Sequence, residues 1–257
     1  MPDKPVALTI AGSDSGGGAG IQADLKAMEA NGVFGTSALA AVTAQNTKEV
    51  RQAYDLPPLL VAAQIDAVAE DMDVRATKTG MLSAPEIIET VADRVQAHDL
   101  FPFVVDPVMI SKSGYKLLQD AAIETLIDEL LPLATVVTPN VHEAEHLTDR
   151  TIETIEGLEA AAEALLDHGP DAVLGKGGHL ADAKEAVDVL VDGTASQRFA
   201  APRIDTPNTH GTGCTYASAI AANLAKGHDL EVAVERAKRY VTGAIGHALP
   251  LGHGRGP

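Results

Sequence analysis

The chain has 257 residues, of which 46% are hydrophobic, so it can bury the core of one large α/β domain or of two small ones. Its 36 acidic and 19 basic side chains give a formal net charge of −17, which opposes nonspecific binding to nucleic acid. No apolar run approaches the roughly 20 residues of a membrane span, and no signal-peptide pattern opens the chain. We therefore expect a cytoplasmic protein with no nucleic-acid or membrane partner.

The cysteine count and the acidic composition bear on the environment of the protein. One cysteine excludes an internal disulfide and a multi-cysteine metal site, and it fits a reducing compartment. The acidic residues are spread along the chain and only 3% of the residues are aromatic, a composition typical of halophilic proteins, in which salt screens the self-repulsion. An ordinary acidic mesophilic enzyme is the alternative, because charge alone does not identify its cause.

Short apolar runs alternate with segments of helical periodicity along the whole chain. In order, we expect a strand at residues 6–10, a helix at 21–30, a strand at 36–42, a helix at 58–72, a strand at 76–81, a helix at 84–97 and a strand at 101–105. There follow a helix at 121–131, a strand at 134–138, a helix at 155–166, a strand at 172–174, a hairpin of 187–191 with 197–200, and helices at 216–225 and 230–248. Residues 46–57 are expected to form an edge insertion or a lid.

This alternation predicts one α/β domain over residues 1–257, with a doubly wound, mainly parallel sheet flanked by helices. In such sheets ligands bind beyond the carboxyl ends of the strands. The polar residues that follow predicted strands are Ser13, Asp14, Gln45, Asn46, Asp106, Asn140 and Lys176. We expect these side chains to meet at one edge of the sheet.

The only cysteine lies in a glycine-punctuated turn, Asn-Thr-His-Gly-Thr-Gly-Cys-Thr at residues 208–215, ahead of an alanine-rich helical stretch. If that stretch is a helix, the backbone N–H groups of Gly211, Thr212, Gly213 and Cys214 and the helix dipole stabilise an anion there. The same field is expected to lower the pKa of the Cys214 thiol, which could then take a proton from an attacking hydroxyl. The alternative is a helix capped by Thr209 or His210, with a small buried cysteine.

The N-terminal loop is rich in glycine, but it fits neither common nucleotide-binding motif. Gly17 is followed by Gly18 and Ala19 rather than by Lys and Ser or Thr, so the loop is not a Walker A sequence. Its glycines recur at every second residue, which excludes the dinucleotide fingerprint. Asp24, on the next helix, could accept hydrogen bonds from a ring amine or hydroxyl; a solvated helix face is the alternative.

Three residues beyond later strands are suited to magnesium or phosphate. Asp106 follows a buried run, where a carboxylate could bind Mg²⁺ through water, although an N-cap or turn aspartate fits equally. Asn140 and Glu143 share one face at the start of a helix and could reach one hydrated metal or phosphate cluster. A capping arrangement explains the same spacing, since Asn caps well and Glu at the third position can bond back.

Lys176 lies between glycines after a predicted strand, where an ammonium could bind nucleotide phosphates or line a base pocket. An ordinary loop lysine is the alternative. The histidines show no metal-binding pattern: His142 and His146 are four apart but lack the Glu of a zinc-protease helix. The sequence therefore does not predict a zinc site.

Taken together, several segments resemble the hydroxymethylpyrimidine/phosphomethylpyrimidine kinases of thiamine biosynthesis, which belong to the ribokinase-like superfamily. The segments are residues 11–26, Lys78 to Leu82, Asp106 to Met109, Thr138 to Asn140 with Glu143, Lys176 to His179, and the octapeptide around Cys214. The similarity covers nearly the whole chain. It implies that ATP, with Mg²⁺, phosphorylates the hydroxymethyl group of 4-amino-5-hydroxymethyl-2-methylpyrimidine and then the phosphate of that product.

The resemblance also implies a role for each matching residue. Those of the pyrimidine pocket are Gly12, Asp24, Gln45 and Met81. Those of the anion hole are Gly211, Thr212 and Gly213, with Cys214 as the catalytic base. Those that contact ATP are Asn140, Lys176, Thr209 and Lys238, and those near magnesium are Asp106 and Glu143.

One departure from the wider superfamily concerns the base, because most ribokinase-like enzymes have an aspartate where this chain has Cys214. A cysteine points to the pyrimidine kinases or to their close relatives that phosphorylate pyridoxal. The alternatives are therefore a pyridoxal, pyridoxine or sugar kinase of the same superfamily, or a non-catalytic pyrimidine-sensing protein on the same scaffold. We also expect a homo-oligomer, most simply a dimer.

Overall fold

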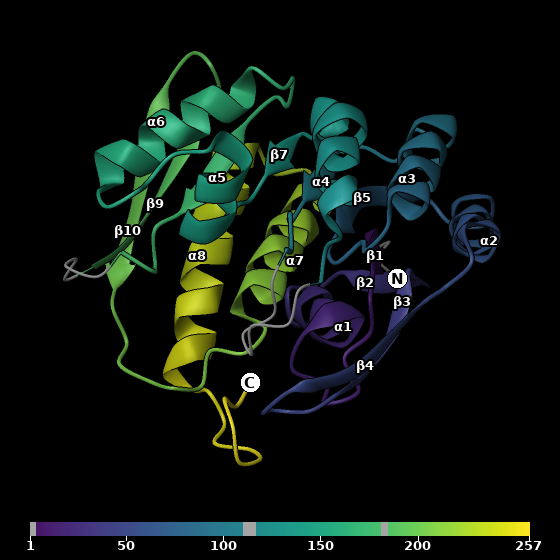
Figure 1. Ribbon diagram of the computed structural model, residues 1–257, viewed down its shortest axis with the longest axis horizontal. Coiled ribbons are helices and arrows are strands. Elements are labelled where there is room, and N and C mark those ends of the chain that lie inside the picture. Colours follow the sequence, from purple (N-terminus) through teal and green to yellow (C-terminus); the bar gives the residue numbers. More distant parts are fainter. Residues whose placement is uncertain (1–3, 110–116, 181–184) are drawn as a thin grey trace.

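A computed structural model describes residues 4–109, 117–180 and 185–257 (Figure 1). Its main sheet has eight strands in the order β10-β9-β8-β7-β6-β5-β1-β2. The strands are β1 (Val6–Ala11), β2 (Phe34–Leu39), β5 (Val74–Thr79), β6 (Phe103–Val105), β7 (Val136–Val137), β8 (Val173–Lys176), β9 (Glu185–Val191) and β10 (Ser196–Pro202). From β2 to β8 neighbouring strands are parallel, whereas β9 runs antiparallel to both β8 and β10.

Helices cover both faces of this sheet, as Figure 1 shows. One face carries α1 (Gly20–Ala30), α7 (Thr212–Ala225) and α8 (Leu230–Gly246). The other carries α2 (Pro58–Ala69), α3 (Pro85–Ala97), α4 (Asp120–Thr125) and α6 (Ile155–Leu166), with α5 (Val141–Thr148) packed beside α6. The predicted doubly wound, mainly parallel α/β fold is confirmed.

The two cores explain why the central strands read as continuous apolar runs. Successive residues of a strand point to opposite faces, so Phe103 and Val105 of β6 enter one core and Val104 enters the other. All three side chains are fully buried. A strand covered on both faces has no solvent side on which polar residues could alternate.

Two predicted elements differ from the structure. The strand expected at 36–42 is two strands, because the chain bends at Ala40 and continues as β3 (Ala41–Gln45), which pairs with β4 (Val50–Asp55) in a separate antiparallel sheet. The predicted insertion at 46–57 is thus the second half of a hairpin. The helix expected at 121–131 ends as α4 at Thr125 and continues as one π turn (Leu126–Leu130) and one 3₁₀ turn (Leu131–Leu133).

The parallel strands bring the polar loops together. β1, β5, β6, β7 and β8 point the same way, so the segments that follow them open at one edge of the sheet. The N-terminus of α7 and the hairpin of β3 and β4 reach the same edge. None of the helices in the described ranges is long and apolar enough to cross a membrane.

Candidate active site

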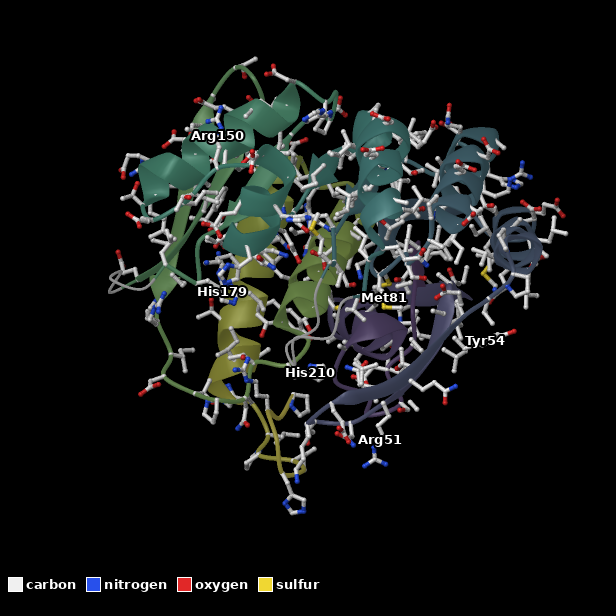
Figure 2. The ribbon with its side chains drawn as sticks, in the orientation of Figure 1. Arg51, Tyr54, Met81, Arg150, His179 and His210 are labelled. Atoms are coloured by element: carbon white, nitrogen blue, oxygen red, sulfur yellow. The ribbon has the colours of Figure 1, made fainter. Side chains whose placement is uncertain are left out.

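A cavity of about 1050 Å³ opens at the carboxyl ends of the parallel strands. Asn46, one of the polar residues expected at this edge, does not line it. Of the residues that the resemblance assigns to the site, all but Asp24 line it: Gly12, Gln45, Met81, Asp106, Asn140, Glu143, Lys176, Thr209, Gly211, Thr212, Gly213, Cys214 and Lys238. Met81, His179 and His210, labelled in Figure 2, mark different parts of its wall. Gly12 and Lys238, which are 226 positions apart in the chain, therefore share one cavity.

The turn before α7 has the geometry of an anion site. Gly211 is the N-cap of α7, with φ at 75°, and no side chain caps the helix, so neither Thr209 nor His210 is the cap. Thr212, Gly213 and Cys214 form the first turn, whose N–H groups have no intrahelical acceptor. A Cβ at Gly211 would collide with the carbonyl oxygen of Gly18, so only glycine lets the two loops pack backbone on backbone.

The Cys214 thiol lies between two helix N-termini. It is the third residue of α7, and its sulfur accepts a hydrogen bond from the N–H of Gly20, the first residue of α1. Nevertheless, burial raises the pKa of the thiol to about 11, an effect that the charge of Lys78 and the Gly20 N–H only partly offset. The expected lowering of the pKa is therefore wrong, because desolvation of the thiolate outweighs the effects of Lys78 and the Gly20 N–H.

Asp24 is fully buried, so it does not lie on a solvated helix face, and it does not line the cavity. Its carboxylate accepts hydrogen bonds from Lys78 at 3.0 Å to each oxygen, from Thr9 at 2.7 Å and from Ser218 at 2.7 Å. The face of α1 that carries Asp24 packs on α7 rather than toward the opening.

Lys78 is a cavity residue that sequence reasoning missed. Its side chain is fully buried, and although burial alone would lower the pKa of its ammonium, the Asp24 carboxylate raises it above the usual value. The signal was available: a lysine inside a predicted strand that is covered on both faces needs a buried partner. Which carboxylate supplies the charge could not be read from the sequence.

Asp106 and Lys176 form a second ion pair, in which Asp106 is buried and Lys176 is partly exposed. The Lys176 ammonium lies 2.9 Å from Asp106, which also accepts a hydrogen bond from Thr138 at 3.1 Å. Burial would lower the pKa of Lys176, but Asp106 and Glu143 raise it. Lys176 is therefore not an ordinary loop lysine; it is a charged group at the cavity wall, and Asp106 is its partner.

Asn140 and Glu143 form a capping box at the start of α5. Asn140 Oδ1 accepts from the Glu143 N–H at 3.1 Å, and Glu143 Oε2 accepts from the Asn140 N–H at 2.8 Å. The capping alternative is thus confirmed, and both residues also line the cavity. No group of three or more His, Cys, Asp or Glu side chains is placed to hold a metal within the described part of the chain.

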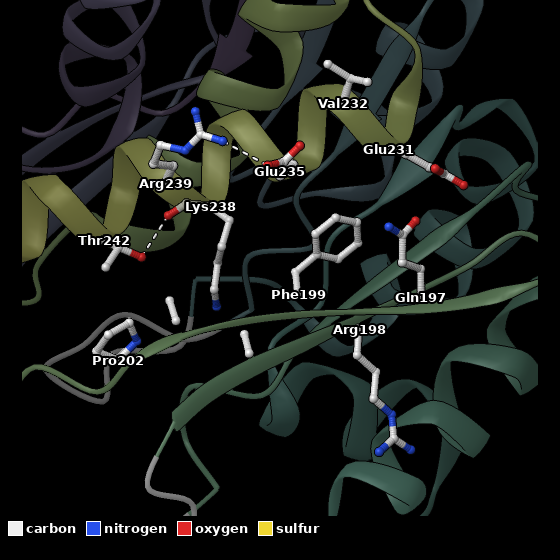
Figure 3. A pocket seen from close by; sticks show the side chains of 12 residues that line it. Gln197, Arg198, Phe199, Pro202, Glu231, Val232, Glu235, Lys238, Arg239 and Thr242 are labelled. Carbon is white, nitrogen blue, oxygen red and sulfur yellow. Dashed lines mark hydrogen bonds and ion pairs between the residues drawn. The ribbon is translucent and has the colours of Figure 1, made fainter.

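Lys238 forms a third ion pair, with Asp188 of β9, a residue that the sequence did not single out. The distance between Lys238 Nζ and Asp188 Oδ2 is 2.6 Å, and Asp188 Oδ1 accepts from the Gly177 N–H at 3.1 Å. Figure 3 shows Lys238 extending from α8 toward the strands, beside a smaller pocket of about 560 Å³ between α8 and β10. Lys238, Pro202 and Thr242 line both this pocket and the large cavity.

His210 connects the glycine loop to the turn before α7, and it too was missed. Its Nε2 lies 2.9 Å from Asp14 Oδ2 and 3.3 Å from the side-chain nitrogen of Gln45. Burial tends to raise the pKa of Asp14, but His210 and the N–H groups of Gly16 and Ala19 lower it below the usual value. The Asp14 carboxylate thus fixes the shape of the glycine loop and, through His210, the distance between that loop and the turn before α7.

We predict that Gly211→Ala destabilises the protein more than Gly227→Ala does. Both glycines have positive φ, at 75° and 80°, which costs an L-residue roughly 1–2 kcal/mol. Only at Gly211 would the new Cβ also meet backbone, that of Gly18, whereas nothing lies near it at Gly227. Urea unfolding of the two variants measures the difference, and equal losses would show that the two loops do not depend on this close packing.

Comparison with known proteins agrees with this geometry. A family model described as phosphomethylpyrimidine kinase matches residues 14–257. The hydroxymethylpyrimidine/phosphomethylpyrimidine kinase of Streptomyces coelicolor is 53% identical over 253 residues, which cover 98% of this chain and 93% of that protein.

Solved structures give the same result. The crystal structure of phosphomethylpyrimidine kinase from Clostridium difficile 630 has a TM-score of 0.83 and 47% identity, covering 94% of this chain and 100% of that one. The ADP complex of Bacillus subtilis pyridoxal kinase has a TM-score of 0.93 and 38% identity, covering 99% and 97%. The chain described here therefore belongs to the phosphomethylpyrimidine kinase family and has the ribokinase-like fold.

Proposed function

We propose that this protein uses ATP to phosphorylate the hydroxymethyl group of 4-amino-5-hydroxymethyl-2-methylpyrimidine, and then phosphorylates the resulting monophosphate to the diphosphate, in thiamine biosynthesis. The observation that carries the proposal is the N-terminus of α7, with Cys214, which opens on a cavity beside Lys176 and Asp106: a Cβ at Gly213 would lie 3.6 Å from Lys176 Nζ and 3.7 Å from Asp106 Oδ2. One cavity would serve both transfers, because each adds a phosphoryl group to an oxygen on the same side chain of the ring.

Phosphoryl transfer requires little covalent chemistry from the protein. Phosphoryl transfer has a loose transition state with charge on the equatorial oxygens, so positioning and charge stabilisation dominate. The N–H groups of Gly213 and Cys214 would stabilise that charge at the start of α7. Cys214 would accept the hydroxyl proton as a thiolate, which is its minor form near pH 7 because burial raises its pKa to about 11.

The nucleotide would lie along the wall that carries Asn140, Lys176, Thr209 and Lys238. Two ammonium groups on that wall, the buried Lys238 and the partly exposed Lys176, suit a polyphosphate. The residues also fit Mg²⁺, which is usually bound by one or two carboxylates together with substrate phosphates rather than by an all-protein cage. Asp106 and Glu143 would hold it, and bound magnesium would neutralise phosphate charge.

The pyrimidine would occupy the part of the cavity lined by Gly12, Gln45 and Met81. A Cβ at Gly12 would lie 2.8 Å from Met81 Cε, so glycine there leaves the methionine room to pack against a flat ring. Gln45 offers an amide that both donates and accepts, which suits an aminopyrimidine edge. Asp24, below the cavity floor, would act on the ring only through its neighbours.

A pyridoxal kinase activity is the second candidate, favoured by the 0.93 TM-score to a solved pyridoxal kinase. Mass spectrometry after incubation with ATP, magnesium and either the pyrimidine alcohol, its monophosphate or pyridoxal separates the two. We expect monophosphate and diphosphate from the pyrimidine, and much slower product formation from pyridoxal. Faster phosphorylation of pyridoxal would overturn the proposal, and binding without turnover would favour a sensing protein.

The control for this assay is Cys214→Ala. Loss of a general base lowers turnover by roughly 10²-fold or more, while the binding contacts of the ring remain. We therefore expect little product from the variant and little change in pyrimidine affinity. Turnover equal to that of the wild type would remove Cys214 from the role of base.

We predict that Gln45→Ala weakens pyrimidine binding and leaves ATP binding unchanged. Loss of a hydrogen bond to a ligand costs about 1 kcal/mol or more, which corresponds to an increase in Kd of at least several-fold. The matched control is Gln52→Ala, an exposed glutamine on the partner strand of the same hairpin. Isothermal titration with each ligand checks this, and equal weakening for the pyrimidine and ATP would contradict it.

A homodimer, a cytoplasmic location and adaptation to high salt are further proposals. The exposed outer face of the β3–β4 hairpin carries a cross-strand apolar pair, Val42 and Tyr54, and a two-stranded sheet is marginal alone in water. A second copy of the chain would cover this face, aided by salt that screens the net charge of −17.

We predict that the wild type sediments as a dimer, more completely at high salt, and that Tyr54→Glu is monomeric. A charge at an apolar interface must lose its hydration without a partner, which is why one substitution suffices. Sedimentation velocity at two salt concentrations measures both effects. A wild-type monomer at both concentrations would refute self-association.

A further inference from the structure

Lys78 is the most completely buried charged side chain at the cavity, and the proposed reaction does not yet use it. Its relative exposure is 0%, as is that of its partner Asp24. Burying an ion pair costs desolvation that the attraction between the two charges often fails to repay, so the pair is weak evidence for stability. We therefore examine a role for Lys78 in the chemistry of the site.

Two helices bring this pair to the thiol. On α1, Gly20 and Asp24 are four residues apart and so lie on one face; on α7, Cys214 and Ser218 are likewise four apart. Two hydrogen bonds, one helical turn apart, connect these faces. The Gly20 N–H donates to the Cys214 sulfur, and the Ser218 hydroxyl donates to Asp24 Oδ1 at 2.7 Å. The thiol is thus one helical turn from the level of the buried pair, about 5–6 Å between Cβ positions.

Lys78 reaches the Asp24 carboxylate from the sheet. It lies on β5 and bonds to Asp24 at 3.0 Å through its ammonium group. A Cβ at Gly80 would lie 2.8 Å from that nitrogen, so the glycine leaves room for the ammonium. Lys78 and Cys214 both line the cavity, whereas Asp24 and Ser218 lie behind them.

We propose that Lys78, held in place by Asp24 and Ser218, is the positioning residue that stabilises the thiolate form of Cys214 during phosphoryl transfer. This inference rests on the proposed function insofar as Cys214 is the base. The hydroxyl O–H bond breaks as the S–H bond forms, the new O–P bond forms as the bond from γ-phosphorus to the ADP oxygen breaks, and Lys78 keeps its proton throughout.

The charges around the thiol come from four elements. Burial is the largest influence and raises the pKa of Cys214; Lys78 on β5 lowers it, while Asp24 on α1 and Asp106 after β6 raise it. Lys176 on β8 also interacts with the thiol, which in turn raises the pKa of that lysine. Without Lys78, burial and the two carboxylates would raise the pKa of Cys214 further and favour the neutral thiol.

The test uses the fact that Cys214 is the only cysteine, so alkylation by iodoacetamide reports on one thiol. The rate is measured from pH 7 to 10.5 without substrates. For Lys78→Met we expect a higher thiol pKa, with alkylation slower by about tenfold for each pKa unit. For Asp24→Asn we expect the opposite, because Lys78 is left with the thiolate as its counter-ion.

Two further variants distinguish an effect on the thiol pKa from a loss of the fold. The double variant Lys78→Met/Asp24→Asn removes the buried charges together and should keep the fold, with a thiol pKa between those of the single variants. Lys48→Met, which removes an exposed lysine on the hairpin, should leave the alkylation profile unchanged. Circular dichroism establishes which variants are folded; if Lys78→Met unfolds, Asp24→Asn and the double variant carry the comparison.

A kinetic measurement separates this inference from the function itself. With the pyrimidine alcohol, Lys78→Met should lower kcat and leave KM nearly unchanged, since Lys78 acts on the base rather than on binding. An unchanged thiol pKa in Lys78→Met, or a shift of the same sign in Asp24→Asn, would overturn the inference while leaving the kinase function intact. Opposite shifts in a protein that makes no pyrimidine phosphate would instead refute the function alone.

Discussion

Buried pairing of lysine with aspartate is the constraint on which the cavity depends. Three such pairs lie at the carboxyl edge of the sheet: Lys78 with Asp24, Lys176 with Asp106, and Lys238 with Asp188. An ammonium group cannot remain charged in this interior without a counter-ion, so each carboxylate keeps a cation where an anionic ligand would need it. A chain with a net charge of −17 thereby maintains fixed positive charges at one place.

The backbone contributes the remaining polarity. α1 and α7 both begin at the cavity, and their first turns converge on one sulfur atom, so two helix N-termini act on the same group. Burial still dominates and raises the pKa of the thiol to about 11, so the neutral thiol prevails near pH 7. For a reaction with a loose transition state this is a consistent arrangement, because the proton leaves the attacking hydroxyl late and a strong resting base is unnecessary.

The sequence predicts the fold well and the site only in outline, for a physical reason. Apolar periodicity is local, so alternating strands and helices can be read from it, and polar residues after parallel strands must share an edge. Partners are not local: Asp24 has its lysine 54 positions away, and Lys238 has its aspartate 50 positions away. Those ion pairs, and the burial that raises the pKa of Cys214, exist only once the chain is folded. Asp24 was misplaced for the same reason, because a helix position does not reveal which neighbour covers it.

Ligand binding must also act on this network of pairs. Asp106 accepts a hydrogen bond from Lys176, and under the proposed reaction the same carboxylate would hold magnesium while the same ammonium would bind phosphate. The ligands would then separate the pair. Asp106 would exchange one cation for another, and Lys176 would exchange one anion for another, so each would keep a partner of opposite charge. Selection of the ring then falls to the part of the cavity without ion pairs between lysine and aspartate, around Gly12, Gln45 and Met81.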